Sequence, residues 1–259
     1  KNSDKNIVKF LKKNNLMDYF VYPQINWKNK SLNIHNISKN LNINLNTIVF
    51  VDDNPFEREE VKTNFPSVRV FDITDLDAIK DLLKTKEITE EAKNRRISYQ
   101  KEEKRKLISD KEFNNKYLDF IKYCNINLNI FKPSTESDYK RCKELLQRTN
   151  QLNLNGFKYN DESFNNIISN INNFYYAIEV NDRFGSYGIV GFFIINFKNT
   201  TIEINEMAIS CRVANKFIEI TILKFLKDHF KLFSNIIIKF QESEININFI
   251  TILQKIGFT

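Results

Sequence analysis

Two adjacent carboxylates, Asp52 and Asp53, are the residues of this chain best placed to do chemistry. They follow the apolar run 47–51 and precede Pro55, which suits the first turn of a helix. In open α/β sheets, ligands collect at the carboxyl ends of strands, where loops leave a crevice. Two neighbouring carboxylates repel each other unless a proton or a cation intervenes, and Mg²⁺ is a usual partner of carboxylate oxygens. The run therefore predicts a magnesium site at the end of a strand.

Alternating strand and helix patterns over residues 1–87 predict an α/β domain with a parallel sheet. The expected strands are 19–22, 47–51 and 67–71, and the expected helices are 6–13, 31–41, a segment starting at Pro55, and 76–83. This is about half of a doubly wound sheet.

The rest of the chain predicts a second domain of the α+β class. Residues 88–124 are charged and almost free of Gly and Pro, which favours a helical linker. In the domain 125–259, a central antiparallel meander is expected at 174–209, with Gly257 ending the last helix. The other expected elements are strands at 126–131 and 235–240 and helices at 136–148, 164–171, 216–230 and 247–256.

Composition narrows the possible functions. The chain has 259 residues, of which 42% are hydrophobic, enough to form real cores. Its formal charge is +7, but Lys and acidic residues interleave along it, so we expect no nucleic-acid partner. Three widely separated cysteines argue against disulfides and favour a reducing compartment, the cytoplasm. No apolar run is long enough to cross a membrane, so no membrane partner is expected either.

Several motifs follow one another along the chain: residues 25–33 (INWKNKSLN), the Asp52 and Asp53 pair, 148–154 (RTNQLNL), 182–185 (DRFG) with 188–191 (GIVG), 210–213 (SCRV), and Gly257 with Phe258. Together they resemble the FkbH-like family, the subfamily IIIC branch of the haloacid-dehalogenase-like (HAD) phosphatases. The resemblance covers nearly the whole chain in the right order. It implies a partial HAD-like (Rossmannoid) parallel sheet followed by a GNAT-like α+β acyltransferase domain.

The resemblance also implies a reaction. Family members release phosphate from a phosphorylated three-carbon precursor and load its glyceryl (acyl) unit onto the thiol of an acyl carrier protein, for polyketide biosynthesis. On this template Lys30 holds the phosphate oxygens, and Asp52, assisted by Asp53, holds Mg²⁺. The alternative is that Lys30 is an ordinary surface lysine and that Asn54 or Asp53 merely caps the next helix.

One part of the family pattern is missing. The strand that carries the aspartate nucleophile and the Ser or Thr that binds phosphate are absent from this chain, which starts at Lys1 without a methionine. We therefore expect a preceding segment in the parent protein.

A second group of candidate residues follows the predicted strand 201–209. GNAT proteins bind the pyrophosphate of coenzyme A with a loop of the pattern Arg/Gln-x-x-Gly-x-Gly/Ala at the start of a helix. Here the loop begins at Arg212, and Asn215 and Phe217 replace both glycines, which disfavours close approach of the pyrophosphate. Arg212 and Lys216 either attract the phosphate of a carrier-bound phosphopantetheine, in preference to free coenzyme A, or solvate the helix start.

Cys211 and three amides complete the candidate residues. Cys211 is a candidate catalytic acyl acceptor, because the neighbouring Arg212 can lower a thiol pKa; the alternative is an inert buried thiol. Asn150, Gln151 and Asn153 are candidates for cofactor binding or, alternatively, for building a turn.

Three function classes remain open. The first is an FkbH-like phosphatase and acyltransferase. The second is a GNAT-like N- or S-acyltransferase that uses acyl-CoA or an acyl carrier protein. The third is a non-catalytic docking module, for which the +7 charge suits an acidic carrier protein.

The missing nucleophile leads to the first testable prediction. Purified residues 1–259 should show no Mg²⁺-dependent phosphatase activity in a phosphate-release assay, because an aspartyl phosphate cannot form. Robust turnover that disappeared in Asp52→Ala would contradict this prediction.

Overall fold

The computed structural model describes residues 3–41, 43–83, 94–114, 116–149, 152–242 and 246–258. The chain divides into two compact units, Lys1–Glu112 and Phe113–Thr259, and each is described here by itself. We call them the amino-terminal unit and the carboxyl-terminal unit.

A pair of parallel strands organises the amino-terminal unit. Strand β1 (Val49–Val51) pairs with β2 (Arg69–Phe71), and helix α3 (Pro55–Asn64) lies between them in sequence. The side chain of Asn54 accepts a hydrogen bond from the Phe56 N–H, so it caps α3 as its sequence suggests. The expected strand, turn and helix around Asp52 are confirmed.

Short helices complete this unit: α1 (Asp4–Lys13), α2 (Lys30–Leu41), α4 (Leu76–Leu83), α6 (Arg95–Ile108), the 3-10 turns Met17–Tyr19 and Leu45–Thr47, and a π-helical turn, Ser109–Phe113. Its small core is formed by Ile34, Val61 and Val68.

The strand expected at 19–22 is wrong. Tyr19 belongs to a 3-10 turn, and Tyr22 has a φ of 48°, a left-handed conformation that breaks a strand. Within the described residues the parallel sheet has two strands, so a HAD-like sheet is not shown.

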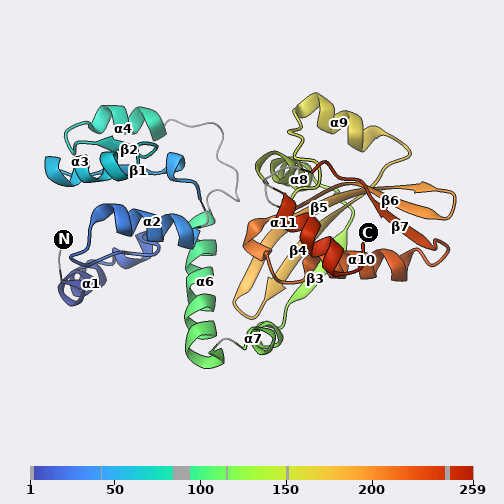
Figure 1. The fold of residues 1–259 in the computed structure, drawn as a ribbon, viewed down its shortest axis with the longest axis horizontal. Coiled ribbons are helices and arrows are strands. Elements are labelled where there is room, and N and C mark those ends of the chain that lie inside the picture. Colours follow the sequence, from blue (N-terminus) through green and yellow to red (C-terminus); the bar gives the residue numbers. More distant parts are fainter. Residues whose placement is uncertain are drawn as a thin grey trace. The chain divides into compact units, whose positions relative to one another are not determined.

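A mixed sheet organises the carboxyl-terminal unit (Figure 1). In its described residues, the strand order is β3-β4-β5-β6-β7. Strands β4 to β6 form the expected antiparallel meander, β3 pairs antiparallel to β4, and β7 joins parallel to β6 after helix α10. Their bounds are β3 (Asn127–Phe131), β4 (Phe174–Asp182), β5 (Gly185–Lys198), β6 (Thr201–Ile209) and β7 (Asn235–Ile238).

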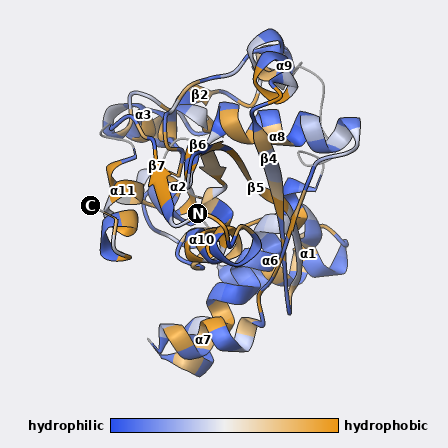
Figure 2. Cartoon of the chain, turned by 90° about the vertical axis from the view of Figure 1, so that its right-hand side faces the viewer, coloured by the Kyte–Doolittle hydropathy of each residue, from blue (hydrophilic) through white to orange (hydrophobic). Residues whose placement is uncertain are grey.

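Helices cover both faces of this sheet. The helices are α7 (Tyr117–Cys124), α8 (Glu136–Arg148), α9 (Asp161–Ser169), α10 (Ile218–His229) and α11 (Ile247–Lys255). Residues of α8 and α9 form a core with Phe192 and Ala208, whereas residues of α10 and α11 form a core with Phe193 and Met207. The helices carry both hydrophilic and hydrophobic residues, whereas β7 is hydrophobic along most of its length (Figure 2). Burial of one face of each helix thus holds the layers together.

A β-bulge at Asn205 divides β6 into two parts. Glu206 pairs with Ile194, but Ile204 pairs with Ile195, so Asn205 is one extra residue in β6. Before the bulge Ile204 faces the core under α10 and α11, and after it Met207 does. The pairing of β7 with β6 covers only residues 201–204. The outer edge of β6 therefore has no β7 partner from the bulge onward.

No helix in the described parts of the chain is both long and apolar enough to span a bilayer.

Gly191 generates a prediction about the sheet. It lies opposite Ile178, and a Cβ added at residue 191 would come within 2.7 Å of Ile178 Cδ1 and 3.2 Å of its Cβ. Gly191→Ala should lower the free energy of unfolding by about 1–3 kcal/mol, because the packed core must shift. Urea unfolding followed by circular dichroism measures this. The control Lys198→Ala, at the exposed end of the same strand, should change it by less than about 0.5 kcal/mol.

Candidate functional site

The amino-terminal candidates Lys30 and Asp52 lie together at the end of β1. Lys30 begins α2 and its Nζ lies 3.1 Å from Asp52 Oδ2. The backbone N–H of Asn54 donates to Asp52 Oδ1 at 3.0 Å. Burial raises the pKa of Asp52, but the hydrogen bond from Asn54 and the Lys30 ammonium outweigh it, so the pKa lies below its ordinary value. The two residues form a preformed, ionised pair.

A second ion pair lies at the same edge of this sheet, and sequence reasoning missed it. Asp72 follows β2 as Asp52 follows β1, and Arg58 on α3 reaches both turns. Arg58 Nη1 lies 2.6 Å from Asp72 Oδ2 and donates to the backbone O of Asp52 at 2.8 Å. The sequence signal was an aspartate after each of two parallel strands.

The donor set does not support Mg²⁺ at this edge. Both oxygens of Asp52 already accept hydrogen bonds, and Asp53 is exposed. Across the described residues, no three His, Cys, Asp or Glu side chains come together as metal ligands. The expected magnesium site is therefore not supported, and we derive no step from it.

The carboxyl-terminal candidates Cys211, Arg212 and Lys216 lie in the turn between β6 and α10. Residues Cys211–Val213 form a 3-10 turn, in which Arg212 Nε lies within 3.4 Å of Ser210 Oγ. Lys216 Nζ donates to the backbone O of Arg212 at 3.3 Å and lies over the ring of Tyr187. Both cations thus contact their own turn.

The same turn keeps a backbone that glycine would favour. Asn215 has a φ of 62° and Phe217 a φ of 60°, at the two positions where the GNAT pattern has glycines. A bulky residue such as Phe217 is rarely found in this left-handed region. The turn therefore has, at both positions, a backbone conformation that glycine would adopt more readily.

A buried carboxylate occupies the start of α10. Glu219 is 6% exposed and lines a hollow of about 440 Å³ together with Asn215 and Phe217. Burial raises the pKa of Glu219, and its own backbone N–H partly offsets this by hydrogen bonding to the carboxylate. A helix start attracts anions, and here the chain's own carboxylate lies there. A second anion such as a pyrophosphate is disfavoured at this position.

Of the three amide candidates, Asn153 is placed, whereas Asn150 and Gln151 lie outside the described residues. Asn153 is fully buried; its Nδ2 donates to the backbone O of Leu146 and of Thr149, and its Oδ1 accepts from the N–H groups of Asn155 and Gly156. Its side chain thus builds a turn.

The turn presents a short extended segment, Leu152 to Leu154, to the outer edge of β6. The Leu154 N–H donates to Met207 O at 3.0 Å, and the Ile209 N–H donates to Leu152 O at 2.8 Å. Asn153 and Ala208 form an antiparallel bridge between these bonds. The segment therefore fills the edge of β6 that β7 leaves after the bulge.

Glu206, next to the bulge, is a functional candidate that sequence reasoning missed. It is 7% exposed, and its Oε1 accepts hydrogen bonds from Tyr159 Oη at 2.7 Å and Asn155 Nδ2 at 3.0 Å. Its buried Oε2 has no hydrogen-bond partner in the described residues. Burial raises the pKa of Glu206, and the two hydrogen bonds only partly offset this. A buried carboxylate with a raised pKa and one unbonded oxygen is suited to accept a proton.

A signal for Glu206 was present in the sequence. A lone carboxylate interrupts the apolar strand 201–209 just before Met207, Ala208 and Ile209. Simple alternation assigns Glu206 to the same face as Ile202 and Ile204, whereas the bulge turns it to the opposite face.

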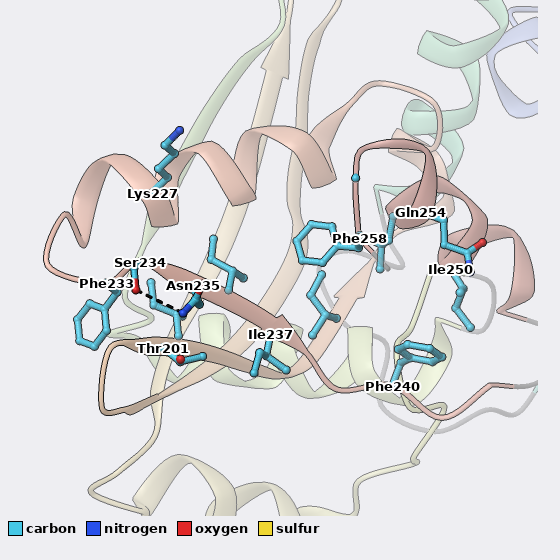
Figure 3. Close-up of a pocket in the computed structure, with 15 residues that line it drawn as sticks. Thr201, Lys227, Phe233, Ser234, Asn235, Ile237, Phe240, Ile250, Gln254 and Phe258 are labelled. Atoms are coloured by element: carbon cyan, nitrogen blue, oxygen red, sulfur yellow. Dashed lines mark hydrogen bonds between the residues drawn. The ribbon is translucent and has the colours of Figure 1, made fainter.

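A second hollow, of about 840 Å³, lies along β7 and α11 (Figure 3). Its walls are largely apolar, including Phe233, Ile237, Phe240 and Phe258, and among the described residues that line it Lys227 alone is charged. This hollow lacks the paired acid and base groups that proton transfer requires.

Comparisons with solved structures find GNAT-family acetyltransferases among the similar folds. The ribosomal-protein-S18-alanine N-acetyltransferase from Escherichia coli is 12% identical, with 51% of this chain and 78% of that chain covered and a TM-score of 0.39. A GNAT family acetyltransferase from Streptococcus pneumoniae is 11% identical, with 52% and 87% covered and a TM-score of 0.37. An aminoglycoside N-acetyltransferase in complex with CoA is 10% identical, with 52% and 89% covered and a TM-score of 0.36. No protein-family model and no curated protein matches the chain.

The ion pair of Asp52 generates a prediction about pH. A carboxyl group whose folded pKa is lowered adds stability above its unfolded pKa of 3.8 and loses it as the pH falls through the folded pKa. Asp52→Asn should therefore cost about 1 kcal/mol of unfolding free energy at neutral pH, and the difference from the parent chain should shrink in acid.

Urea unfolding at neutral and acid pH measures this difference. Asp77→Asn is the matched control, because Asp77 pairs with Lys80 on the surface and its side chain is 97% exposed. It should cost less than about 0.5 kcal/mol at either pH. An Asp52→Asn difference that grew in acid would contradict the assignment.

Proposed function

We propose that the carboxyl-terminal unit is a GNAT-like acyltransferase domain in which Glu206 is the general base. The observation that carries this proposal is the buried Glu206 carboxylate, with one oxygen held by Tyr159 and Asn155 and the other unbonded among the described residues. It lies beside the bulge where β6 parts from β7 in the mixed sheet.

The donor in this proposal is an acyl thioester on a pantetheine arm. The acceptor nucleophile, an amine or a thiol, forms a bond to the acyl carbon, and its proton passes to Glu206 Oε2. The carbon–sulfur bond breaks, and its electron pair leaves with the pantetheine sulfur as a thiolate, which water then protonates. The raised pKa of Glu206 makes it a stronger base than an exposed glutamate.

Coenzyme A fits this chain poorly at its diphosphate end. Glu219 lies at the helix start, and the side chains of Asn215 and Phe217 project from the positions where glycines allow close approach. A pantetheine arm bound to a carrier protein has a single phosphodiester in place of the diphosphate, so there is less repulsion from Glu219 and less crowding by Asn215 and Phe217. We therefore propose an acyl carrier protein as the donor's carrier, and the +7 charge favours an acidic partner of this kind.

Phosphorylated-substrate recognition is a second proposal, for the amino-terminal unit. It is supported by the Lys30 ammonium at the end of β1, beside the guanidinium of Arg58, because cations at strand ends attract phosphate. Calorimetric titration with inorganic phosphate of the parent chain and of Lys30→Ala tests it: the parent should bind phosphate more tightly, and equal affinity would refute the proposal.

Glu206→Gln tests the acyltransferase proposal. The substitution should lower kcat/KM for transfer from an acyl-loaded carrier protein to a thiol or amine acceptor about 100-fold or more, because the amide cannot take the proton. With the parent chain, the transfer rate should increase with pH, and its midpoint should lie above the ordinary glutamate pKa of 4.5. The reason is that the raised pKa keeps Glu206 protonated up to a higher pH.

Glu203→Gln is the matched control for this test. Glu203 lies on the same strand before the bulge and pairs with Lys239 at 2.6 Å, away from the Glu206 cluster. Its substitution should leave the transfer rate within about twofold of the parent. Equal losses in both variants, or full activity in Glu206→Gln, would refute the role of Glu206.

A further inference from the structure

The segment Leu152 to Leu154, which we call the internal strand, occupies the only stretch of β6 edge that β7 leaves open in the described residues. Its hydrogen bonds to β6 are of the peptide ladder type, with Met207 O accepting and Ile209 N–H donating. An extended ligand with amide groups, such as a pantetheine arm, needs the same two groups. The internal strand and such a ligand therefore compete for one edge.

Further contacts hold the internal strand in place. Asn246 Nδ2 donates to the backbone O of Asn153 at 3.2 Å and of Leu154 at 2.9 Å, and also to Gln241 O at 2.9 Å. The Gln241 N–H donates to Leu154 O at 3.2 Å, and the Leu154 side chain is fully buried in the core. Asn246 is thus a clamp between the internal strand and the segment after β7.

We propose that the internal strand is a built-in competitor of the acyl donor, so that the donor's arm binds along β6 only after Leu152 to Leu154 leave that edge. This inference rests on the proposed acyltransferase function and concerns the regulation of its donor site. Departure exposes Leu154 to water and breaks the Asn246 bonds, whereas the arm restores the two bonds to Met207 and Ile209. The resting chain therefore binds the arm weakly, because only the small fraction with an open edge is competent.

Asn246→Ala tests the proposal by weakening the clamp while leaving β6 and Glu206 intact. The probe is a stable thioether analogue of acyl-pantetheine, titrated by calorimetry. Its Kd should fall about tenfold or more, because the open fraction rises. Thr251→Ala, in the helix α11 that Asn246 precedes, is the control, because the Thr251 hydroxyl donates to Ile247 O within that helix. Its Kd should equal that of the parent chain.

Amide hydrogen exchange on the parent chain gives a second readout that needs no variant. Saturating probe should speed exchange of the Leu154 N–H about tenfold or more, because it loses Met207 O, while the Ile209 N–H stays protected by the probe. A probe that binds with unchanged Leu154 protection, or with equal affinity for the parent and Asn246→Ala, overturns the internal competitor.

The two proposals fail in different ways. If Asn246→Ala gains no affinity but Glu206→Gln still abolishes transfer, the competitor is refuted and the acyltransferase function stands. If neither chain binds the probe and neither transfers an acyl group, both proposals are refuted.

Discussion

The β-bulge at Asn205 is the constraint on which the carboxyl-terminal unit depends. Strand pairing fixes which side chains face each layer, because successive residues alternate between the two faces. One extra residue reverses that alternation, so Ile204 and Met207 reach the same core while Glu206 turns to the opposite face. The bulge also coincides with the end of β7 pairing, which leaves a length of backbone edge for the internal strand.

The polar groups around this edge are buried because they satisfy one another. A buried amide or carboxylate without a partner costs about 1–3 kcal/mol, so clusters of such groups must be nearly complete. Asn153 and Asn246 use their side chains on backbone atoms of three separate segments, and Tyr159 and Asn155 bond to Glu206. Against this background Glu206 Oε2 stands out, because it is one of the few buried side-chain atoms that have no hydrogen-bond partner in the part of the chain that the structure describes.

In the amino-terminal unit, the half-buried charges at the ends of the two strands are paired with opposite charges. Two aspartates follow two parallel strands, and Lys30 and Arg58 pair with them directly. Burial raises the pKa of Asp52, but the hydrogen bond from Asn54 and the Lys30 ammonium together lower it further. Hydrogen bonding to Thr74, with a smaller contribution from Arg58, lowers the pKa of Asp72. A cation site needs carboxylate oxygens that are free to coordinate, and here the protein's own donors use those of Asp52. At this edge the cations and the carboxylates thus neutralise one another.

Local sequence patterns were enough to predict the bounds of several helices and strands. Pro55 and Asn54 predicted the start of α3, helix α8 has the expected bounds, and strand β6 was predicted residue for residue, because capping and alternation are encoded by neighbours in sequence. The strand expected at 19–22 is wrong, because Tyr22, whose ring is buried, has a left-handed φ.

Only the tertiary structure decided what occupies each edge and pocket. Asn153 lies 55 residues from Ala208 in sequence by their numbers, so no local pattern predicts their bridge. The bulge reverses the alternation that sequence reasoning assumes, and therefore hid Glu206. The local sequence determines whether a segment has the periodicity of a helix or of a strand. Which other segment it packs against or pairs with depends on packing energies summed over residues that are distant in sequence.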